Sequence, residues 1–360
     1  MKGLQPVGDG ISGSAASSSS AFAPASNPLE RVGQLIVGYR GAKVLLAAVE
    51  LDLFRALDAT DGRLPALSRR TGFLLHHLEV LLDALVALGF LEKSAGRYSN
   101  TTFSREWLHP DGAHSLVNIL RFQELLSQPY AELVSAIRTG GPRQNLGDLL
   151  TQRPNFVEPY IGSMAEISQR PAKELVGALN IAGARDLLDV GGGPGVYCRA
   201  CLEKNAVLRG VILDVPETLK IARRLIGNGP LAERITLKEG DYHNDDFGRS
   251  CYDLVLMSHI THDESPDDNQ ALLRKAHAAL RPGGRVVVHD FMTKDDGTAP
   301  LFSVLFSVHM LTFTKAGRVY SEADYSAWLK GAGFQIVQRV DVGSDAPGST
   351  VALAAMKMER

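Results

Sequence analysis

The chain has 360 residues, of which 45% are hydrophobic and 22% are charged, and its formal net charge at pH 7 is −2. This composition is typical of a globular protein with enough apolar material for a large core, and the length favours about two domains. The near-neutral charge excludes the strongly basic surface that nucleic acid or an anionic membrane attracts, and no apolar run approaches the ~20 residues of a membrane span.

The N-terminal third predicts a leader followed by a small helical domain. Residues 1–28 are rich in Ser, Ala, Gly and Pro, and we expect a disordered leader rather than a signal peptide. Residues 29–108 predict helices followed by a hairpin over 90–98, the pattern of a winged helix. A DNA-reading helix would carry Arg, Lys, Asn or Gln, but residues 73–77 read F-L-L-H-H. We therefore favour packing or dimerisation over DNA binding, which stays an alternative.

The rest of the chain predicts a helical region and then an α/β domain. Residues 109–180 are helical and apolar, with a break at Gly140-Gly141-Pro142, and we expect them to link the domains and to line a substrate pocket. Residues 181–360 alternate strand and helix, as a parallel Rossmann-like sheet requires, with a turn at Pro282-Gly283-Gly284 before the fifth strand. The seven expected strands are 186–190, 210–214, 235–238, 253–257, 285–290, 335–340 and 350–355.

A glycine-rich corner follows the first of these strands. Residues 189–195 read D-V-G-G-G-P-G, in which Gly191 and Gly193 let the backbone pass close to a ligand and Asp189 places a carboxylate at the end of the strand. The third glycine of a dinucleotide fingerprint is replaced by Val196, and no lysine of a phosphate-binding loop is present. The corner therefore favours a positively charged ligand without phosphates, and S-adenosylmethionine is such a ligand.

Acidic residues end the next two strands. Asp214 is placed to accept hydrogen bonds from ribose hydroxyls, although it also suits a helix cap before Pro216. Asp241 and Tyr242 follow the third strand, where they would contact an adenine ring, and an ordinary turn acid is the rival interpretation of Asp241. These residues extend the predicted nucleotide site along the carboxyl edge of the sheet.

Two histidines end the fourth strand, in S-H-I-T-H-D. His259 and His262 are candidates for a general base because imidazole titrates near neutral pH. Asp290 ends the neighbouring strand, where its carboxylate could orient an imidazole. The sequence therefore predicts a base and its orienting acid beside the bound nucleotide.

Six motifs occur in order along the chain: D-V-G-G-G-P-G, I-L-D-V-P, G-D-Y, H-D, L-R-P-G-G-R-V-V-V and G-R-V-Y-S-E. As a set they resemble the motifs of the class I S-adenosylmethionine-dependent methyltransferases. They are most similar to the bacterial branch of the plant-type small-molecule O-methyltransferases, over residues 30–358. The resemblance implies a seven-stranded Rossmann-like catalytic domain preceded by a winged-helix domain that forms a homodimer. It also implies methylation of a hydroxyl on a small natural product, in the cytoplasm.

The resemblance also assigns roles to single residues. The family's base falls on His262 and its first acid on Asp290, whereas its second acid falls on Val319, which cannot act as one. The implied cofactor residues are Asp189, Gly191, Gly193, Asp214, Asp241, Tyr242 and Ser258. The implied substrate-pocket residues are Met164, His259, His309 and Met310.

Three alternatives stay open at this point. The same fold could methylate carbon or nitrogen, or use the cofactor without methyl transfer. His262 and His309, with Asp263 or Asp290, could hold a metal ion, although we predict none. Cys198 and Cys201 form a C-x-x-C pattern, but without a second ligand pair we favour two small helix residues in a reducing compartment.

Overall fold

The computed structural model describes residues 27–153, 157–342 and 350–358. Its contacts divide the chain into two compact units, with the boundary between Ser104 and Arg105. The expected leader lies outside the described residues except for Asn27 and Pro28. At these two residues the first helix already begins, because the Asn27 side chain accepts a hydrogen bond from the Glu30 amide and Pro28 occupies the first helical position.

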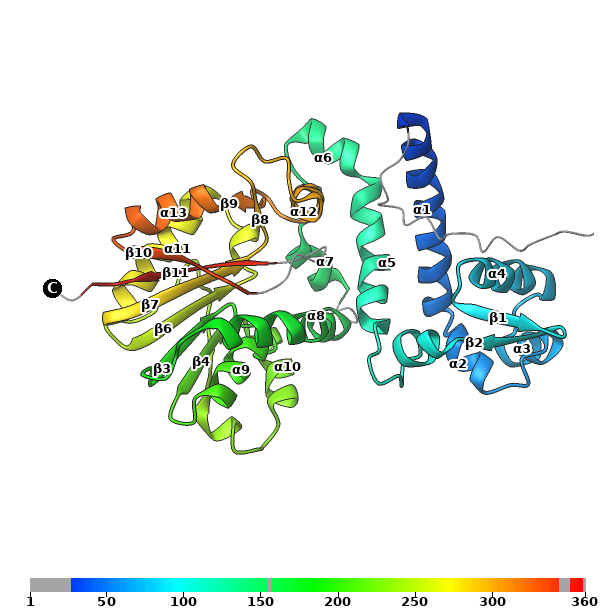
Figure 1. The fold of residues 1–360 in the computed structure, drawn as a ribbon, viewed down its shortest axis with the longest axis horizontal. Coiled ribbons are helices and arrows are strands. Elements are labelled where there is room, and N and C mark those ends of the chain that lie inside the picture. The colour runs from blue at the N-terminus through cyan, green and yellow to red at the C-terminus, as the bar shows by residue number, and fades with distance from the viewer. Residues whose placement is uncertain (1–26, 154–156, 343–349, 359–360) are drawn as a thin grey trace, which may run out of the picture. The chain divides into compact units, whose positions relative to one another are not determined.

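The N-terminal unit contains four helices and one hairpin (Figure 1). They are α1 Pro28–Glu50, α2 Leu53–Asp58, α3 Leu64–Thr71, α4 Leu75–Ala87, β1 Leu91–Ser94 and β2 Arg97–Asn100. Helix α3 ends where Gly72 takes a positive φ, and the hairpin turns at Ala95 and Gly96, both also at positive φ. The expected helix-turn-helix with a wing is therefore present, and leucines such as Leu67, Leu82 and Leu85 form its core.

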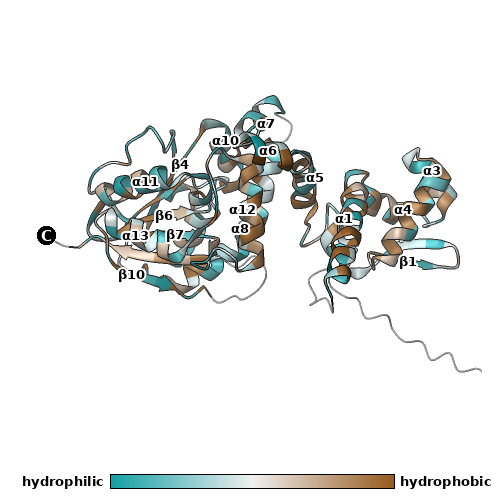
Figure 2. Ribbon diagram, turned by 90° about the horizontal axis from the view of Figure 1, so that it is seen from above, coloured by the Kyte–Doolittle hydropathy of each residue, from teal (hydrophilic) through white to brown (hydrophobic). Residues whose placement is uncertain are grey.

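Helix α1 leaves many of its apolar side chains exposed, as its brown face in Figure 2 indicates. Leu35, Val37 and Tyr39 are among them. Among the described residues, α1 alone has the length and mean hydropathy, 1.3, of a membrane-crossing helix. This corrects the expectation that no segment approaches that length, although Arg40 and Lys43 interrupt the apolar face. An exposed apolar face also suits an interface with another chain.

The second unit begins with a helical region. After a short π-helical turn, Ser104–Leu108, come α5 Val117–Ala131, α6 Leu133–Thr139, α7 Leu146–Gln152 and α8 Val157–Ala178. The predicted break at Gly140 is present, because Gly140 takes a positive φ just after α6. Helices α5 and α8 pack together, and an apolar cluster joins this region to the helix that contains Phe313.

A seven-stranded sheet follows, in the order β10-β11-β7-β6-β3-β4-β5. Its strands are β3 Asp186–Val190, β4 Arg209–Asp214, β5 Ile235–Glu239, β6 Tyr252–Ser258, β7 Leu280–Asp290, β10 Gln335–Val340 and β11 Val351–Met356. Strand β11 runs antiparallel to β7 and β10, and the other pairs are parallel. All seven expected strands are present. The expected turn before the fifth strand is wrong, because β7 begins at Leu280 and runs through Pro282–Gly284, with Gly283 bonded to Lys357.

Helices cover both faces of this sheet (Figure 1). They are α9 Val196–Lys204, α10 Pro216–Ile226, α11 Pro266–Ala279 and α13 Glu322–Gly331, together with α8. Helix α12 Leu301–Phe313 instead packs against α5, α6 and β8 Met292–Thr293, which forms a small parallel pair with β9 Tyr320–Ser321. One core cluster joins the sheet to α11 and α13, and the other joins it to α8, α9 and α10. Because side chains alternate along each strand, neighbouring residues at the carboxyl ends face opposite clusters.

Candidate active site

The glycine corner connects β3 to α9. Asp189 is fully buried, and its Oδ2 accepts a hydrogen bond of 3.1 Å from the Cys198 amide in the first turn of α9, whereas its Oδ1 has no partner among the described residues. Gly191 has a φ of 59°, and a Cβ there would come within 2.7 Å of Ile260. Gly193 has a φ of 56° and nothing within 4 Å of its missing Cβ. The protein thus leaves no room for a side chain at Gly191, whereas the space beside Gly193 is open.

Asp214, at the end of β4, holds the corner in place. Its Oδ2 accepts the Gly193 amide at 2.8 Å and its Oδ1 accepts the Val215 amide at 2.8 Å. Burial raises the pKa of Asp214, and these backbone bonds oppose the rise. A carboxylate has about four acceptor sites, so ribose hydroxyls can still be bound.

Asp241 and Tyr242 occupy the turn after β5. Asp241 accepts hydrogen bonds from the His243 amide at 2.9 Å and from the Asn244 side chain at 2.6 Å. These are the contacts of an ordinary turn acid, which was the rival interpretation of this residue. Tyr242 donates to Glu264 Oε1 at 2.8 Å, and its ring lies beside Gly191. Glu264, which the sequence did not select, therefore orients the predicted adenine-stacking ring.

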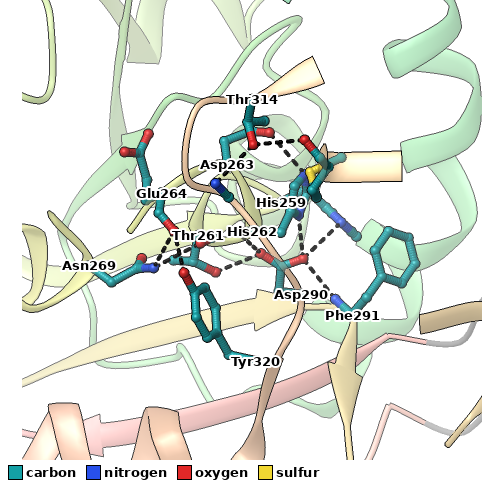
Figure 3. Close-up of polar contacts among 12 residues, drawn as sticks. His259, Thr261, His262, Asp263, Glu264, Asn269, Asp290, Phe291, Thr314 and Tyr320 are labelled. Atoms are coloured by element: carbon teal, nitrogen blue, oxygen red, sulfur yellow. Dashed lines mark hydrogen bonds and ion pairs between the residues drawn. The ribbon is translucent and has the colours of Figure 1, made fainter. Parts of the chain in front are cut away.

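The predicted base and acid are in direct contact (Figure 3). His262 lies in a short 3-10 turn, Thr261–Asp263, and its Nδ1 is 2.6 Å from Oδ1 of Asp290 at the end of β7. The other carboxylate oxygen accepts the Thr261 hydroxyl at 2.6 Å and the His262 amide at 3.2 Å. Asp290 is fully buried and His262 is 7% exposed. One carboxylate thus holds both the ring and the backbone of His262.

The electrostatics of this pair follow from its geometry. Burial is the largest single influence and opposes a charge on His262, but the carboxylates of Asp290, Asp263 and Glu264 together outweigh it and raise the pKa of His262 to about 9. Burial likewise opposes ionisation of Asp290, yet the His262 ring holds the pKa of that carboxyl well below its usual range. The pair therefore exists as imidazolium and carboxylate at neutral pH.

Side chains from three other elements fix the turn that contains His262, and Figure 3 shows two of them, Asn269 and Tyr320. Asn269 of α11 donates to the Thr261 carbonyl at 2.9 Å, and Tyr320 of β9 donates to the Glu264 carbonyl at 2.6 Å. Tyr325 of α13 is 2.7 Å from the Thr261 hydroxyl. The sequence analysis missed these residues, since their types are common and only the fold brings them to this turn.

His259 and Ser258 complete the end of β6. His259 has a φ of 56°, unusual for a residue with a side chain, and its Nδ1 lies 3.8 Å from Asp290 Oδ1. Burial lowers the pKa of His259 to about 4, so this ring is neutral. Ser258 is buried, and within the part of the chain that the structure describes its hydroxyl has no hydrogen-bond partner.

A metal ion fits this histidine pair poorly. Within the described ranges, the group of side chains close enough to share an ion is His259, His262 and Asp290, whose ligand atoms lie within 4.8 Å of one another. It does not include His309, which the sequence had offered as a ligand. Nδ1 of His262 and Oδ1 of Asp290 are closer together than two ligands of a tetrahedral ion, so binding would require their hydrogen bond to break.

Aromatic rings form the surroundings of His262 on the side of α12. Phe306 meets the His262 ring at 4.9 Å and 90°, and Phe291 lies 4.7 Å from Phe306. His309 lies 5.3 Å from Phe306 and stacks on Tyr130 at 5.7 Å, and burial lowers its pKa to about 4. His309 is thus placed next to the predicted base as a neutral imidazole.

The other predicted pocket residues lie farther into the apolar core. Met164 of α8 packs against the cluster that contains Phe122 and Phe313, and Met310 is buried with 3% exposure. Val319, at the position of the second acid, is fully buried, and its amide donates to Ser307. His262 therefore has one orienting carboxylate, Asp290, and an aliphatic residue where the resemblance implied another acid.

The seven-stranded sheet, its glycine corner and the acids at its carboxyl ends define a methyltransferase with an N-terminal dimerisation domain. The model of the O-methyltransferase domain matches residues 136–335, and that of the O-methyltransferase dimerisation domain matches residues 34–110. The chain belongs to this O-methyltransferase family, which is S-adenosylmethionine-dependent. The predicted family, fold class, enzyme class and cofactor are confirmed.

Two curated relatives from Streptomyces cover almost the whole chain. The 3-hydroxy-5-methyl-1-naphthoate 3-O-methyltransferase of Streptomyces sahachiroi is 30% identical over 95% of this chain and 99% of its own length. The L-tyrosine C(3)-methyltransferase of Streptomyces lavendulae is 30% identical over 87% of this chain and 89% of its own length. A solved structure described as PigF with SAH is 25% identical, with a TM-score of 0.83, over 92% of this chain and all of that one.

Proposed function

We propose that this enzyme transfers a methyl group to a phenolic hydroxyl of a small aromatic natural product, with His262 as the general base. The 2.6 Å contact between His262 Nδ1 and Asp290 is the observation that supports this proposal most directly. A hydrogen bond to a buried carboxylate fixes the Nδ1–H tautomer once the ring is neutral, and it leaves Nε2 as the proton acceptor.

The reaction needs a positioned hydroxyl and a place for its proton. S-adenosylmethionine supplies an electrophilic methyl group on a sulfonium. With the cofactor bound, the substrate oxygen would form a bond to that methyl carbon as the sulfur–methyl bond breaks, which leaves S-adenosylhomocysteine as a neutral thioether. The hydroxyl proton would pass to Nε2 of the neutral His262 ring. Removing this proton as attack proceeds contributes typically ~10²–10⁴-fold to the rate. The tight turn around His262 supports a second contribution, which is the alignment of the oxygen for in-line attack.

The chain's own residues fit the cofactor. Asp214 and the Gly193 amide beside it are placed for the ribose, and the Tyr242 ring is placed for the adenine. Asp189 and Ser258 each have a buried oxygen without a partner in the described structure, which a polar ligand could satisfy. These observations support a cofactor at the carboxyl ends of β3, β4 and β6.

The rings around His262 support a planar aromatic acceptor. Phe291, Phe302 and Phe306 lie within 6.0 Å of one another, centroid to centroid, on the side of the predicted base. Val319 replaces a second acid, so Asp290 is the carboxylate that accepts a hydrogen bond from the His262 ring, and Asp263, 3.7 Å from Nε2, adds to the basicity of His262. An acceptor whose hydroxyl is already acidic, such as a phenol, suits this base better than an aliphatic alcohol. We propose no nucleic-acid or membrane partner, and a cytoplasmic homodimer.

Methyl transfer to a naphthol-type probe tests this proposal. We would incubate the enzyme with cofactor labelled in the methyl group and 3-hydroxy-5-methyl-1-naphthoate, the acceptor named for the relative in Streptomyces sahachiroi. The His262→Ala variant should lose about 10²–10⁴-fold in turnover. His114→Ala, at an exposed histidine, is the matched control and should retain full turnover.

Label found on oxygen, with the loss confined to His262→Ala, would support the proposal. Label found on a ring carbon, or near-normal turnover of His262→Ala across neutral pH, would overturn it. If the naphthoate is not methylated, a panel of simple phenols and matched aliphatic alcohols distinguishes a different phenol from a different acceptor class.

A further inference from the structure

Two buried hydroxyl groups form a chain that ends on the carboxylate of Asp290. The Thr261 hydroxyl lies 2.6 Å from Oδ2 of Asp290, and the Tyr325 hydroxyl lies 2.7 Å from the Thr261 hydroxyl. Tyr325 and Asp290 are fully buried, and Thr261 is 1% exposed. We call these two hydroxyls the hydroxyl pair. It contacts the carboxylate oxygen that the His262 ring does not use.

The hydrogen atoms of this chain can be placed from the donors and acceptors alone. An ionised carboxylate only accepts, so the single hydrogen of the Thr261 hydroxyl is donated to Asp290. The Thr261 oxygen must then accept from the Tyr325 hydroxyl. Burial raises the pKa of Tyr325 well above its ordinary value, so this residue keeps its hydrogen. Both hydroxyls are therefore donors in the direction of Asp290.

The Thr261 hydroxyl completes the set of hydrogen bonds to Asp290. Oδ1 accepts from Nδ1 of His262 at 2.6 Å and from the Phe291 amide at 2.8 Å. Oδ2 accepts from the Thr261 hydroxyl at 2.6 Å and from the His262 amide at 3.2 Å. A carboxylate has about four acceptor sites, so these donors use all of them. The Thr261 hydroxyl and the His262 ring thus bind opposite oxygens of one carboxylate at the same distance and compete for its charge.

This competition affects the strength of His262 as a base. A hydrogen bond to a carboxylate stabilises its charge, and in a buried chain each hydrogen bond polarises the next. The more of the Asp290 charge the hydroxyl pair stabilises, the less that charge stabilises a proton on the His262 ring. A larger fraction of His262 is then neutral, which is the form that accepts a proton from the substrate.

We propose that Thr261 and Tyr325 are positioning residues that act through Asp290 and limit how tightly His262 holds its proton. The proposal deepens the proposed function and rests on it, because the basicity of His262 matters to turnover only where His262 is the base. It also gives a role to the Tyr325 hydroxyl, which lies within the apolar core cluster that joins the sheet to α11 and α13.

Other titratable groups face the His262–Asp290 pair and the hydroxyl pair from the surrounding elements. They are His259, Asp263 and Glu264 after β6, His289 of β7, Tyr197 of α9, His309 of α12, Tyr320 of β9 and Asp324 of α13. Burial lowers the pKa of His259 to about 4 and that of His289 to about 3, so both rings are neutral. In the described ranges none of these side chains donates to Oδ2 of Asp290. A change in His262 on removal of the Thr261 hydroxyl therefore reports the hydroxyl pair.

NMR titration of the His262 ring tests the proposal without substrate. Thr261→Val replaces the hydroxyl with a methyl group of similar size, and it should raise the pKa of His262 above its native value of about 9 by roughly 0.5 to 1. Tyr325→Phe removes only the outer hydroxyl and should raise this pKa by a smaller amount. Thr261→Ser keeps the hydroxyl and should restore the native value.

The rate profile should move with the titration. We would measure methyl transfer to the phenolic probe from pH 6 to about 10.5. In Thr261→Val the rising part of kcat/KM should shift to higher pH by the same amount as the pKa of His262, which lowers kcat/KM at pH 7 by about 3- to 10-fold. Damage to the turn alone would instead lower the plateau at high pH and leave the midpoint of the rise unchanged.

Tyr320→Phe is the matched control for this experiment. The Tyr320 hydroxyl is also buried against the His262 turn, but it donates to the Glu264 carbonyl and not to Asp290 or Thr261. Its removal should leave the pKa of His262 unchanged, whatever it does to the stability of the fold.

An unchanged pKa of His262 in Thr261→Val, or an equal change in Tyr320→Phe, would overturn the proposal. If Thr261→Val does not fold, Tyr325→Phe decides the question, since it must raise the pKa of His262 and Tyr320→Phe must not. A His262 pKa that rises as expected while the rate profile stays in place would overturn only the proposed function, in which His262 is the base.

Discussion

Replacing Asp290 with Asn should move the pKa of His262 from above neutrality to below it. The pKa of His262 is about 9 against 6.5 for an unperturbed histidine, which corresponds to about 3 kcal/mol in favour of the imidazolium. Burial acts against that charge, and the carboxylates overcome it together, with Asp290 the largest contributor among them. At His309, burial, with a smaller contribution from His262, lowers the pKa to about 4. Asp290→Asn should therefore bring His262 below 6.5.

The rate profile should follow this shift. In the native enzyme the neutral, proton-accepting form of His262 increases about tenfold per pH unit up to about pH 9, so kcat/KM should rise with pH over that range. In Asp290→Asn the rise should end below pH 6.5, and the plateau should be lower because a neutral amide orients and stabilises the imidazolium less well. The assay is methyl transfer to the phenolic probe from pH 6 to about 10, with the His262 ring followed by NMR without substrate.

The stability of the fold gives an independent check. Because the folded pKa of His262 lies above its unfolded value, the pair stabilises the fold below pH 6.5, and this contribution disappears as the pH rises through about 9. Asp290→Asn should remove that dependence. It should also cost about 1–3 kcal/mol, because the amide has one accepting oxygen and cannot accept both from the Thr261 hydroxyl and His262 amide on one side and from Nδ1–H of His262 on the other. A His262 titration near 9 that persists in Asp290→Asn would refute the reasoning.

Three further predictions concern the rest of the molecule. Burial raises the pKa of Asp189 from 3.8 to about 7, which disfavours its carboxylate by about 4 kcal/mol at high pH. The free energy of unfolding should therefore fall as pH rises from 3.8 to about 7. Asp189→Asn should raise the melting temperature of the free protein at pH 8. Calorimetry should show that the same variant binds S-adenosylhomocysteine more weakly. Tyr325→Phe removes a hydrogen-bond partner of the Thr261 hydroxyl and should lower the free energy of unfolding by about 1–3 kcal/mol in denaturant melts. An unchanged midpoint would argue that the contact between Tyr325 and Thr261 does not stabilise the fold. Light scattering at micromolar concentration should give twice 38.8 kDa, through residues 29–108, and a fully active monomer would exclude this interface.

The sequence predicted the sheet well because its central strands β3, β4, β6 and β7 contain buried apolar runs. Asp214 and Asp290 end β4 and β7 at the predicted residues, and Asp189 is the last residue but one of β3. The turn at Pro282–Gly284 was misplaced, since proline and glycine usually end a strand, yet here Gly283 and Gly284 pair with Lys357 and extend β7. That pairing partner lies far along the chain, and no local pattern contains it.

The candidate site likewise contains some residues that the sequence could predict and others that it could not. His262 and Asp290 could be predicted because histidine and aspartate after neighbouring parallel strands meet at one edge of the sheet. Asn269, Tyr320 and Tyr325 could not, because their contacts with the His262 turn depend on how α11, β9 and α13 pack. His289 did leave a signal, which is a polar residue continuing the buried run V-V-V-H-D of β7.

The two adjacent residues His289 and Asp290 show how one strand can serve two parts of this site. Asp290 faces the side of α13, where it holds His262 and Thr261, whereas His289 faces the side of α9, where it meets Tyr197. The alternation of side chains along β7 thus separates the charged His262–Asp290 pair on one face from the neutral His289 ring on the other. His259, neutral and close to both rings, lies between them, 5.1 Å from His289 and 6.2 Å from His262, centroid to centroid. A protonated ring at that position would repel the imidazolium of His262, so the low pKa that burial gives His259 preserves the basicity of the predicted base.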